Sequence, residues 1–232
     1  DKGILIDDFK LLQDEPTNIT KVPVVASEPI QKLIYDDMLF LAGTLNTKVF
    51  RIPAMITAAN GDLIATCDAR RDHGADLNRS HDIDIAIRRS SDNGKSWTDM
   101  GLICDLGEGH PASDPSLVLD ETTGEIFCFY NYMDRSKKLE YRLYVQSSKD
   151  NGVTWGEPRD FTDEVTLPEW KWDFKFITSG RAVQRRNGEI LHTLVRVGKG
   201  VHLFGTKNHG KSWYLKTEKP VHPADESKVI EL

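Results

Sequence analysis

Charged residues around one polar loop are the first candidates for chemistry in this sequence. The loop spans residues 71–82 and reads RDHGADLNRSHD. Arg51 and Arg70 precede it, Asp76 lies inside it, and Asp114 follows further along the chain. If the fold brings these guanidinium and carboxylate groups to one opening, they form the polar ring that is typical of a small-molecule site. We therefore ask which elements position them.

A short motif that ends in tryptophan occurs three times. The copies are SSDNGKSW at 90–97, SKDNGVTW at 148–155 and TKNHGKSW at 206–213, so the repeat unit is 58 residues long. The Asn-Gly or His-Gly pair supplies the positive φ of a tight hairpin turn, and the preceding Asp can accept N–H bonds within that turn. We expect the aspartates and tryptophans of these boxes to be structural.

A second landmark gives the order of elements in each unit. A glycine turn enters an apolar strand at GDLI (61–64), GEIF (124–127) and GEIL (188–191). Each unit then reads strand, glycine turn, strand, loop, strand, box turn, strand. Four antiparallel strands of this kind predict one blade of an all-β propeller, and the chain is long enough for roughly four blades.

Strand direction predicts which residues meet. Arg51, Asp114 and Thr178 each lie ten residues before a unit's glycine, where its first strand begins. The second strand returns to the same end, so the 71–82 loop joins them there and the boxes lie opposite. The first strand of a blade lines the propeller axis, so these three residues should converge at one mouth, with Arg70 and Asp76 above them.

Composition narrows the class of protein. The 232 residues carry a net charge of −6, which excludes a generally basic nucleic-acid binder. With 39% hydrophobic and 28% charged residues and no long apolar run, we expect a globular chain without a membrane segment. The three cysteines form no CxxC pair, and His73 and His81 have no third ligand at metal-site spacing. We expect neither a metal nor a cofactor.

The sequence Phe50-Arg51-Ile52-Pro53, followed by repeated S-x-D-x-G-x-x-W boxes (Asp boxes, or BNR repeats), resembles the sialidases, or exo-α-neuraminidases, of bacterial and animal type. The first motif together with the boxes is specific, whereas the boxes alone also occur in unrelated propellers. The resemblance implies a six-bladed β-propeller. It covers about residues 46–232, so we expect an N-terminal segment at 1–45, then roughly the first four blades, with the C-terminal blades absent.

The resemblance also implies a role for each matching residue. Arg51 matches the first of three arginines that clamp the sialic acid carboxylate, and Arg70 matches a pocket arginine near the sugar 4-hydroxyl. Asp76 matches the aspartate that acts as acid and base. Asp114 resembles a pocket aspartate that contacts substrate. Glu226 resembles the glutamate that partners a nucleophilic tyrosine.

These roles imply an exo-sialidase that hydrolyses terminal α-linked sialic acids of glycoproteins, glycolipids and oligosaccharides with retention. Arginine suits the substrate carboxylate, and sialidases use a tyrosine nucleophile, which a glutamate can deprotonate. That tyrosine and two more arginines should follow Glu226, but the sequence ends at Leu232. We expect this portion alone to be inactive, the remainder of the domain to be its partner, and the protein to be secreted, periplasmic or on the cell surface.

Several positions have competitors. Arg71 competes with Arg70, although it should point to the other face of its strand. Asp76 competes with three other acidic residues in or beside the loop, namely Asp72, Asp82 and Asp84. Glu231 competes with Glu226, which we prefer because it should begin a new inner strand.

A purely structural interpretation is also available for Asp114 and for two tryptophans. Asp114 precedes Pro115 and could be a turn or strand-cap residue. Trp170 and Trp172 could stack on a sugar or could cover a blade edge. The alternative for the whole chain is a non-catalytic Asp-box propeller that binds glycan or protein. A different propeller glycosidase is a third alternative, and transfer of sialic acid to a sugar in place of water is a fourth.

Overall fold

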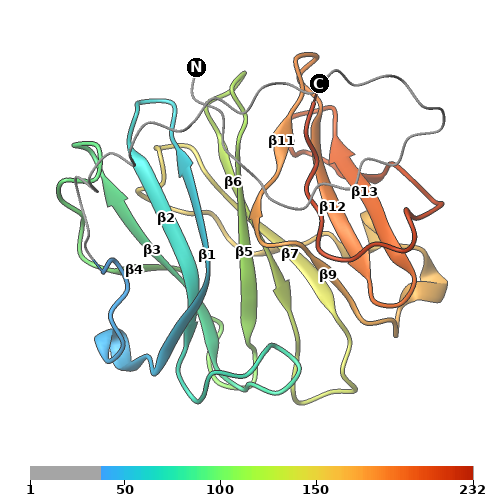
Figure 1. The fold of residues 1–232 in the computed structure, drawn as a ribbon, viewed down its shortest axis with the longest axis horizontal. Coiled ribbons are helices and arrows are strands. Elements are labelled where there is room, and N and C mark those ends of the chain that lie inside the picture. Colours follow the sequence, from blue (N-terminus) through green and yellow to red (C-terminus); the bar gives the residue numbers. More distant parts are fainter. Residues whose placement is uncertain (1–37, 232) are drawn as a thin grey trace, which may run out of the picture. The chain divides into compact units, whose positions relative to one another are not determined.

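The computed structural model describes residues 38–231, and strands dominate this part of the chain (Figure 1). The first sheet follows a 3₁₀ turn at Thr44–Asn46. Its four antiparallel strands pair in chain order, and they are β1 (Val49–Thr57), β2 (Leu63–Arg70), β3 (Ile83–Ser90) and β4 (Gly101–Cys104).

The second sheet repeats this order. Its strands are β5 (Ala112–Leu119), β6 (Ile126–Tyr132), β7 (Arg142–Ser148) and β8 (Arg159–Asp160). The short β10 (Gly180–Arg181) adds to it by pairing parallel with β5. The inner edge of this sheet is therefore covered by chain from the third unit, which ties the two units together.

The third sheet has an interrupted inner strand. Its main path is β11 (Val183–Gln184), β12 (Ile190–Arg196), β13 (Gly200–Thr206) and β14 (Tyr214–Leu215). The segment β9 (Lys175–Ile177) pairs with the other end of β12. The chain leaves β12 between β9 and β11 in order to make the β10 contact with the second sheet.

Helical structure is short in residues 38–231. It comprises α1 (Thr162–Val165) and 3₁₀ turns such as η2 (Pro168–Trp170) before β9. In this part of the chain, the structure has no helix that is long and apolar enough to cross a membrane.

The prediction of an all-β chain with one repeated four-strand order is confirmed. Residues 38–231 form three sheets, rather than the roughly four blades that the length suggested. The estimate of four blades divided the full chain length by the repeat length. It therefore included residues 1–37, which lie outside the described part, and residues 216–231, which make a single β-bridge from Val221 to Val201. The three sheets do not close into a ring, as expected for part of a propeller. The predicted segment 1–45 falls largely outside the described residues.

The box turns fold as the sequence predicts. Asp92 Oδ1 accepts the Ser96 N–H at 2.8 Å, and Asp92 Oδ2 accepts the Ser96 hydroxyl. The third box uses an amide in place of the carboxylate, since Asn208 Oδ1 accepts the Ser212 N–H at 3.0 Å. Either side chain closes the turn because both present an acceptor oxygen.

The box glycines explain how neighbouring sheets pack. A Cβ added to Gly152 in the second box would lie 2.7 Å from Ile64 on β2 of the first sheet. A Cβ added to Gly210 in the third box would overlap the Phe127 ring on β6 of the second sheet. The second and third box turns thus rest against the preceding sheets, which positions successive blades. Two apolar clusters fill the spaces between the sheets.

A bend in the inner strands shapes the mouth of the molecule. The β1–β2 register shifts between Arg51 and Ala54, and the β5–β6 register shifts between Ser113 and Ser116. Ile52 and Asp114 have φ values of 59° and 62°, in the left-handed region that β-branched residues disfavour. Asp114 is therefore the counterpart of Ile52, not of Arg51.

Counting ten residues back from each hairpin glycine does not give equivalent positions in β1 and β5, because the hairpins that follow these strands differ in length. Residues 58–62 join β1 to β2, whereas the longer connection 120–125 joins β5 to β6. Counting back ten residues from each glycine therefore lands one position apart within the bulge. The correct counterpart of Arg51 is Ser113.

Candidate active site

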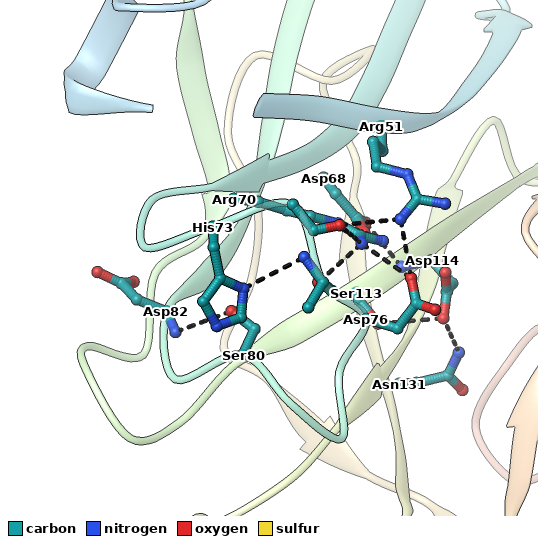
Figure 2. Close-up of polar contacts among 12 residues, drawn as sticks. Arg51, Asp68, Arg70, His73, Asp76, Ser80, Asp82, Ser113, Asp114 and Asn131 are labelled. Carbon is teal, nitrogen blue, oxygen red and sulfur yellow. Dashed lines mark hydrogen bonds and ion pairs between the residues drawn. The ribbon is translucent and has the colours of Figure 1, made fainter. Parts of the chain in front are cut away.

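Two arginines from the first sheet converge on one carboxylate of the long loop (Figure 2). Asp76 Oδ1 lies 3.0 Å from Arg51 Nη1 and 2.9 Å from Arg70 Nη1. The Arg51 side chain is 44% exposed and that of Asp76 is 72% exposed, whereas Arg70 is buried. Arg51 and Asp76 therefore face solvent at one opening. Arg70 does not lie above the mouth as we expected, because its guanidinium is buried beneath them and paired with Asp68.

Asp68 anchors the buried arginine. Its Oδ2 accepts hydrogen bonds from Arg70 Nε at 3.1 Å and Nη2 at 2.8 Å. Its Oδ1 accepts the Asp114 N–H at 2.8 Å, which links the first sheet to the bend of the second. We did not single out Asp68 from the sequence. Its position two residues before Arg70 on one strand puts both side chains on the same face, and that spacing was the available signal.

The loop backbone holds both guanidinium groups. The Gly74 carbonyl accepts from Arg51 Nη1 at 3.0 Å and from Arg70 Nη1 at 2.9 Å, and the Ala75 carbonyl accepts from Arg70 at 2.7 Å. The hydrogen bond from Arg70 lowers the pKa of Asp76 against the opposing effect of partial burial, and the charges of both arginines add to that lowering. Asp76 is therefore ionised while it holds the two arginines.

The competing loop residues have other contacts. Arg71 points away from the pocket and pairs with Asp84, with Nε 2.5 Å from Oδ2. Asp72 organises the loop, since it accepts the Ser80 hydroxyl at 2.6 Å and the His81 N–H at 2.8 Å. Asp82 Oδ1 lies 3.9 Å from Arg71 Nε.

The two loop histidines form no metal centre. His73 accepts the Ala75 N–H through Nδ1 at 3.2 Å, and Figure 2 shows its ring directed away from Arg51. Among residues 38–231, the structure has no group of three or more His, Cys, Asp or Glu side chains that could hold a metal ion. Cys67, Cys104 and Cys128 are buried free thiols.

Asp114 faces the same pocket from the second sheet. Its Oδ2 accepts from Asn131 Nδ2 at 3.0 Å and from Ser113 Oγ at 3.0 Å. Burial raises the pKa of Asp114, and these hydrogen bonds oppose that effect. Asn131 also contacts the backbone of Ile177 on β9 through both its oxygen and its nitrogen. One amide thus fixes the Asp114 carboxylate against the third sheet.

Thr178 does not reach the mouth, contrary to our expectation. It is buried, and its hydroxyl pairs with the Thr193 hydroxyl at 3.1 Å. The next residue, Ser179, lines the pocket in its place. The interrupted inner strand accounts for the shift, because Gly180 turns with a φ of 102° toward the second sheet.

Glu226 lines the pocket and Glu231 does not. Glu231 instead accepts the Arg186 N–H at 2.8 Å and pairs with the Arg185 side chain. The strand that we expected to begin at Glu226 is not formed, because residues 222–231 have no strand partner in the described part of the chain. The Lys228 ammonium holds this segment near the pocket by donating to the Ser179 carbonyl.

One pocket therefore joins the exposed charged groups to an apolar wall. Arg51, Asp76, Asp114 and Glu226 all line it. The remaining lining residues come from the first inner strand, the long loop and the second and third units; they are Ile52, Leu77, Asn78, Tyr141, Phe174, Phe176 and Ser179. The pocket combines a cationic group, several carboxylates and aromatic surface, which suits a small polar ligand with an anionic group.

Sheets of this order, with an arginine–carboxylate pocket at one end, fit part of a β-propeller, and the comparisons with known proteins agree with this fold. Residues 61–227 match the family described as BNR repeat-like domain. The sialidase of Micromonospora viridifaciens is 30% identical over 206 residues, which cover 79% of this chain and 31% of the relative. The sialidase of Bacteroides fragilis (strain YCH46) is 27% identical over 201 residues, covering 75% and 36%.

Comparison with solved structures also finds sialidases. Hadza microbial sialidase Hz136 matches with a TM-score of 0.67 and 27% identity over 75% of this chain and 38% of its own. A leech intramolecular trans-sialidase matches with a TM-score of 0.71, and its 16% identity makes this a likeness of fold alone. The chain belongs to the BNR repeat-like domain family and, within it, to the sialidases. It spans about a third of the length of the two bacterial relatives.

Proposed function

We propose that the protein containing this chain is an exo-sialidase that releases terminal α-linked sialic acids from glycoconjugates. The observation that carries the proposal is the convergence of Arg51, Asp76 and Glu226 on one pocket. A guanidinium group suits the substrate carboxylate, and the two acids supply proton transfer. The sialidase relatives support the same class of reaction.

In this proposal, substrate binding changes the partners of Asp76. The sialic acid carboxylate takes Arg51 as its counter-ion and competes with Asp76 for that group. Loss of one arginine contact raises the pKa of Asp76, because the charge and hydrogen bond of Arg51 both stabilise the carboxylate form. A protonated Asp76 then donates its proton to the departing glycosidic oxygen. Arg70 keeps the loop in place through Gly74 and Ala75.

The nucleophile comes from the rest of the domain in this account. Sialidases use a tyrosine, and Glu226 accepts its phenolic proton as the oxygen attacks the anomeric carbon and the glycosidic bond breaks. Water then attacks the sugar–tyrosine bond and gives its proton to Asp76, while the tyrosine regains its proton from Glu226. Two displacements at one carbon retain the anomeric configuration. The inactivity of this portion alone, and export of the protein, stay predictions.

The test uses the full-length protein with a fluorogenic sialoside and with 3′-sialyllactose. The proposal predicts release of free sialic acid from both substrates. A glycan array run on the same protein separates the alternative, a propeller that only binds. Binding of sialylated glycans without release of sialic acid contradicts the enzyme proposal and supports the binding module.

A further inference from the structure

The 71–82 loop is held by the first sheet on one side of Asp76 only. Two arginines of that sheet bond to oxygen atoms of residues 74–76. Beyond this point the chain makes a tight turn, in which the Asp76 carbonyl accepts the Arg79 N–H at 2.8 Å and the Ser80 N–H at 3.0 Å. Because these bonds tie the turn to Asp76, a displacement of the turn also moves Asp76.

Arg135 from the second sheet holds this turn. It lies half-buried in the loop between β6 and β7, and its Nη1 donates to the Asn78 carbonyl at 2.7 Å. The same nitrogen lies 3.7 Å from the sulfur of the buried Met133. The Arg135 N–H donates to the Gly109 carbonyl at 2.8 Å, and the Gly109 N–H donates to the His81 carbonyl at 2.7 Å. The second unit thus reaches the loop at two backbone carbonyls, and Arg135 takes part in both connections.

The contact with Asn78 is independent of the exchange that the proposed reaction requires. When the substrate carboxylate takes Arg51, the exposed Asp76 keeps only one arginine partner. Arg135 bonds to the backbone beyond Asp76, so this contact stays when the Arg51 contact is lost. It therefore restrains the turn at the stage when Asp76 must point at the substrate.

We propose that Arg135 is a positioning residue, which keeps Asp76 over the pocket while Asp76 protonates the departing sugar. This inference rests on the proposed function. A general acid must lie within hydrogen-bond reach of the leaving oxygen, and a small misplacement lowers the rate strongly. Arg135 is not among the residues that line the pocket, so its effect on the reaction should pass through Asp76.

The experiment uses the full-length protein, 3′-sialyllactose and an aryl sialoside. The measured quantity is the ratio of kcat/KM for 3′-sialyllactose to kcat/KM for the aryl sialoside, since only the first leaving group needs a proton. Arg135→Met keeps an apolar stem beside Met133 and removes the donor. We expect it to lower the ratio about tenfold, less than the 10²- to 10⁴-fold contribution of a complete general acid. Arg135→Lys keeps a charged donor and should recover part of the loss.

Two controls separate positioning from a general loss of structure. In an Asp76→Ala background, Arg135→Met should lower the ratio no further, because the group through which it acts is gone. Arg88→Met is the matched variant. Arg88 is also half-buried and donates to two backbone carbonyls at 2.8 Å, those of Thr98 and Leu39, but it lies at the box end of β3. Its replacement should leave the ratio unchanged.

Hydrogen exchange gives a measurement that is independent of activity. The Arg79 and Ser80 amides should exchange faster in Arg135→Met than in the wild type, since the turn loses a restraint. An unchanged ratio, equal falls of kcat/KM on both substrates, or unchanged exchange in residues 71–82 overturns the positioning role and leaves the proposed function standing. Failure of the wild type to cleave either substrate overturns the proposed function, and this inference with it.

Discussion

Arg51 Nη1 lies 3.0 Å from Asp76 Oδ1, and the buried Arg70 holds the same oxygen at 2.9 Å. One carboxylate oxygen is thus shared by an exposed and a buried guanidinium group. The exposed arginine can leave this contact for a ligand, while the buried one stays bound to Asp68. The carboxylate clamp and the acid of the proposed reaction are therefore coupled before substrate binds.

Replacement of Arg51 tests the clamp. Arg51→Ala should lower kcat/KM for a sialoside roughly 10- to 150-fold, because a hydrogen bond to a charged group contributes about 1.5–3 kcal/mol. Arg51→Lys should recover part of this loss by keeping the charge without the planar fork. Steady-state kinetics of the full-length protein measure both, and an unchanged kcat/KM in Arg51→Ala contradicts the assigned role.

Asp68 should be more important for stability than Asp76. Asp68→Asn disrupts the buried carboxyl group that accepts two hydrogen bonds from Arg70, and we expect the free energy of unfolding to fall by about 3 kcal/mol. Asp76→Asn removes an exposed partner of the same arginine and should cost less than about 1 kcal/mol. Urea unfolding of both variants measures the difference. Equal losses would show that Asp68 does not hold the site in the way described.

Gly210 of the third box and Gly188 of a hairpin turn provide a matched pair for testing the packing between sheets. Gly210→Ala and Gly188→Ala both place a Cβ at positive φ, 73° and 86°, so they share the backbone strain. Only the first also meets the Phe127 ring, because Gly188 has open space. We expect Gly210→Ala to lose about 1–3 kcal/mol more stability in thermal or urea unfolding. A smaller loss than in Gly188→Ala contradicts docking of the box on the preceding sheet.

We predict that protonation of the box carboxylates lowers the free energy of unfolding in acid. Hydrogen bonds from Ser96 lower the pKa of Asp92 to about 2, from an ordinary value of 3.8, and those from Thr154 do the same for Asp150. A carboxylate with a lowered pKa stabilises the fold above its ordinary pKa, and this stabilisation is lost as pH falls from about 4 to about 2.

The third box supplies the control for this effect, since Asn208 makes the same turn without a titrating group. Asp92→Asn and Asp150→Asn together should flatten the dependence of unfolding free energy on pH between about 4 and 2. Measurements of urea unfolding across that range test it. A pH dependence as steep as in the wild type would assign the acid sensitivity to other groups.

The repeated elements could be predicted from the sequence because their signals are local. Asn-Gly turns, glycine hairpins and alternating apolar residues each depend on neighbours within a few positions, and the structure has strands and box turns in that order. Strand direction placed the loop that carries Asp76 at the same end as Arg51, and the two side chains are in contact there. The choice of Asp76 among the acidic residues of the loop came from the resemblance to sialidases.

The errors arise where contacts between units decide the structure. Thr178 was expected at the mouth, but the third inner strand leaves its own sheet so that Gly180 and Arg181 can pair with β5. Asp114 corresponds to Ile52 and not to Arg51, because the hairpins at the far ends of the two strands differ in length by one residue. Trp170 is buried beside the Arg196 guanidinium, whereas Trp172 is half exposed beside the Lys138 ammonium, and both contacts are with residues distant in the sequence. No local pattern encodes such partners.

The most direct test of the whole account is the leaving-group dependence of Asp76→Ala in the full-length protein. Loss of a general acid typically lowers the rate 10²- to 10⁴-fold when the leaving group needs a proton. We predict a fall of that size for 3′-sialyllactose and a much smaller fall for an aryl sialoside, whose phenolate leaves unaided. Equal rates for wild type and Asp76→Ala on 3′-sialyllactose would contradict the central claim that this pocket protonates a departing sugar.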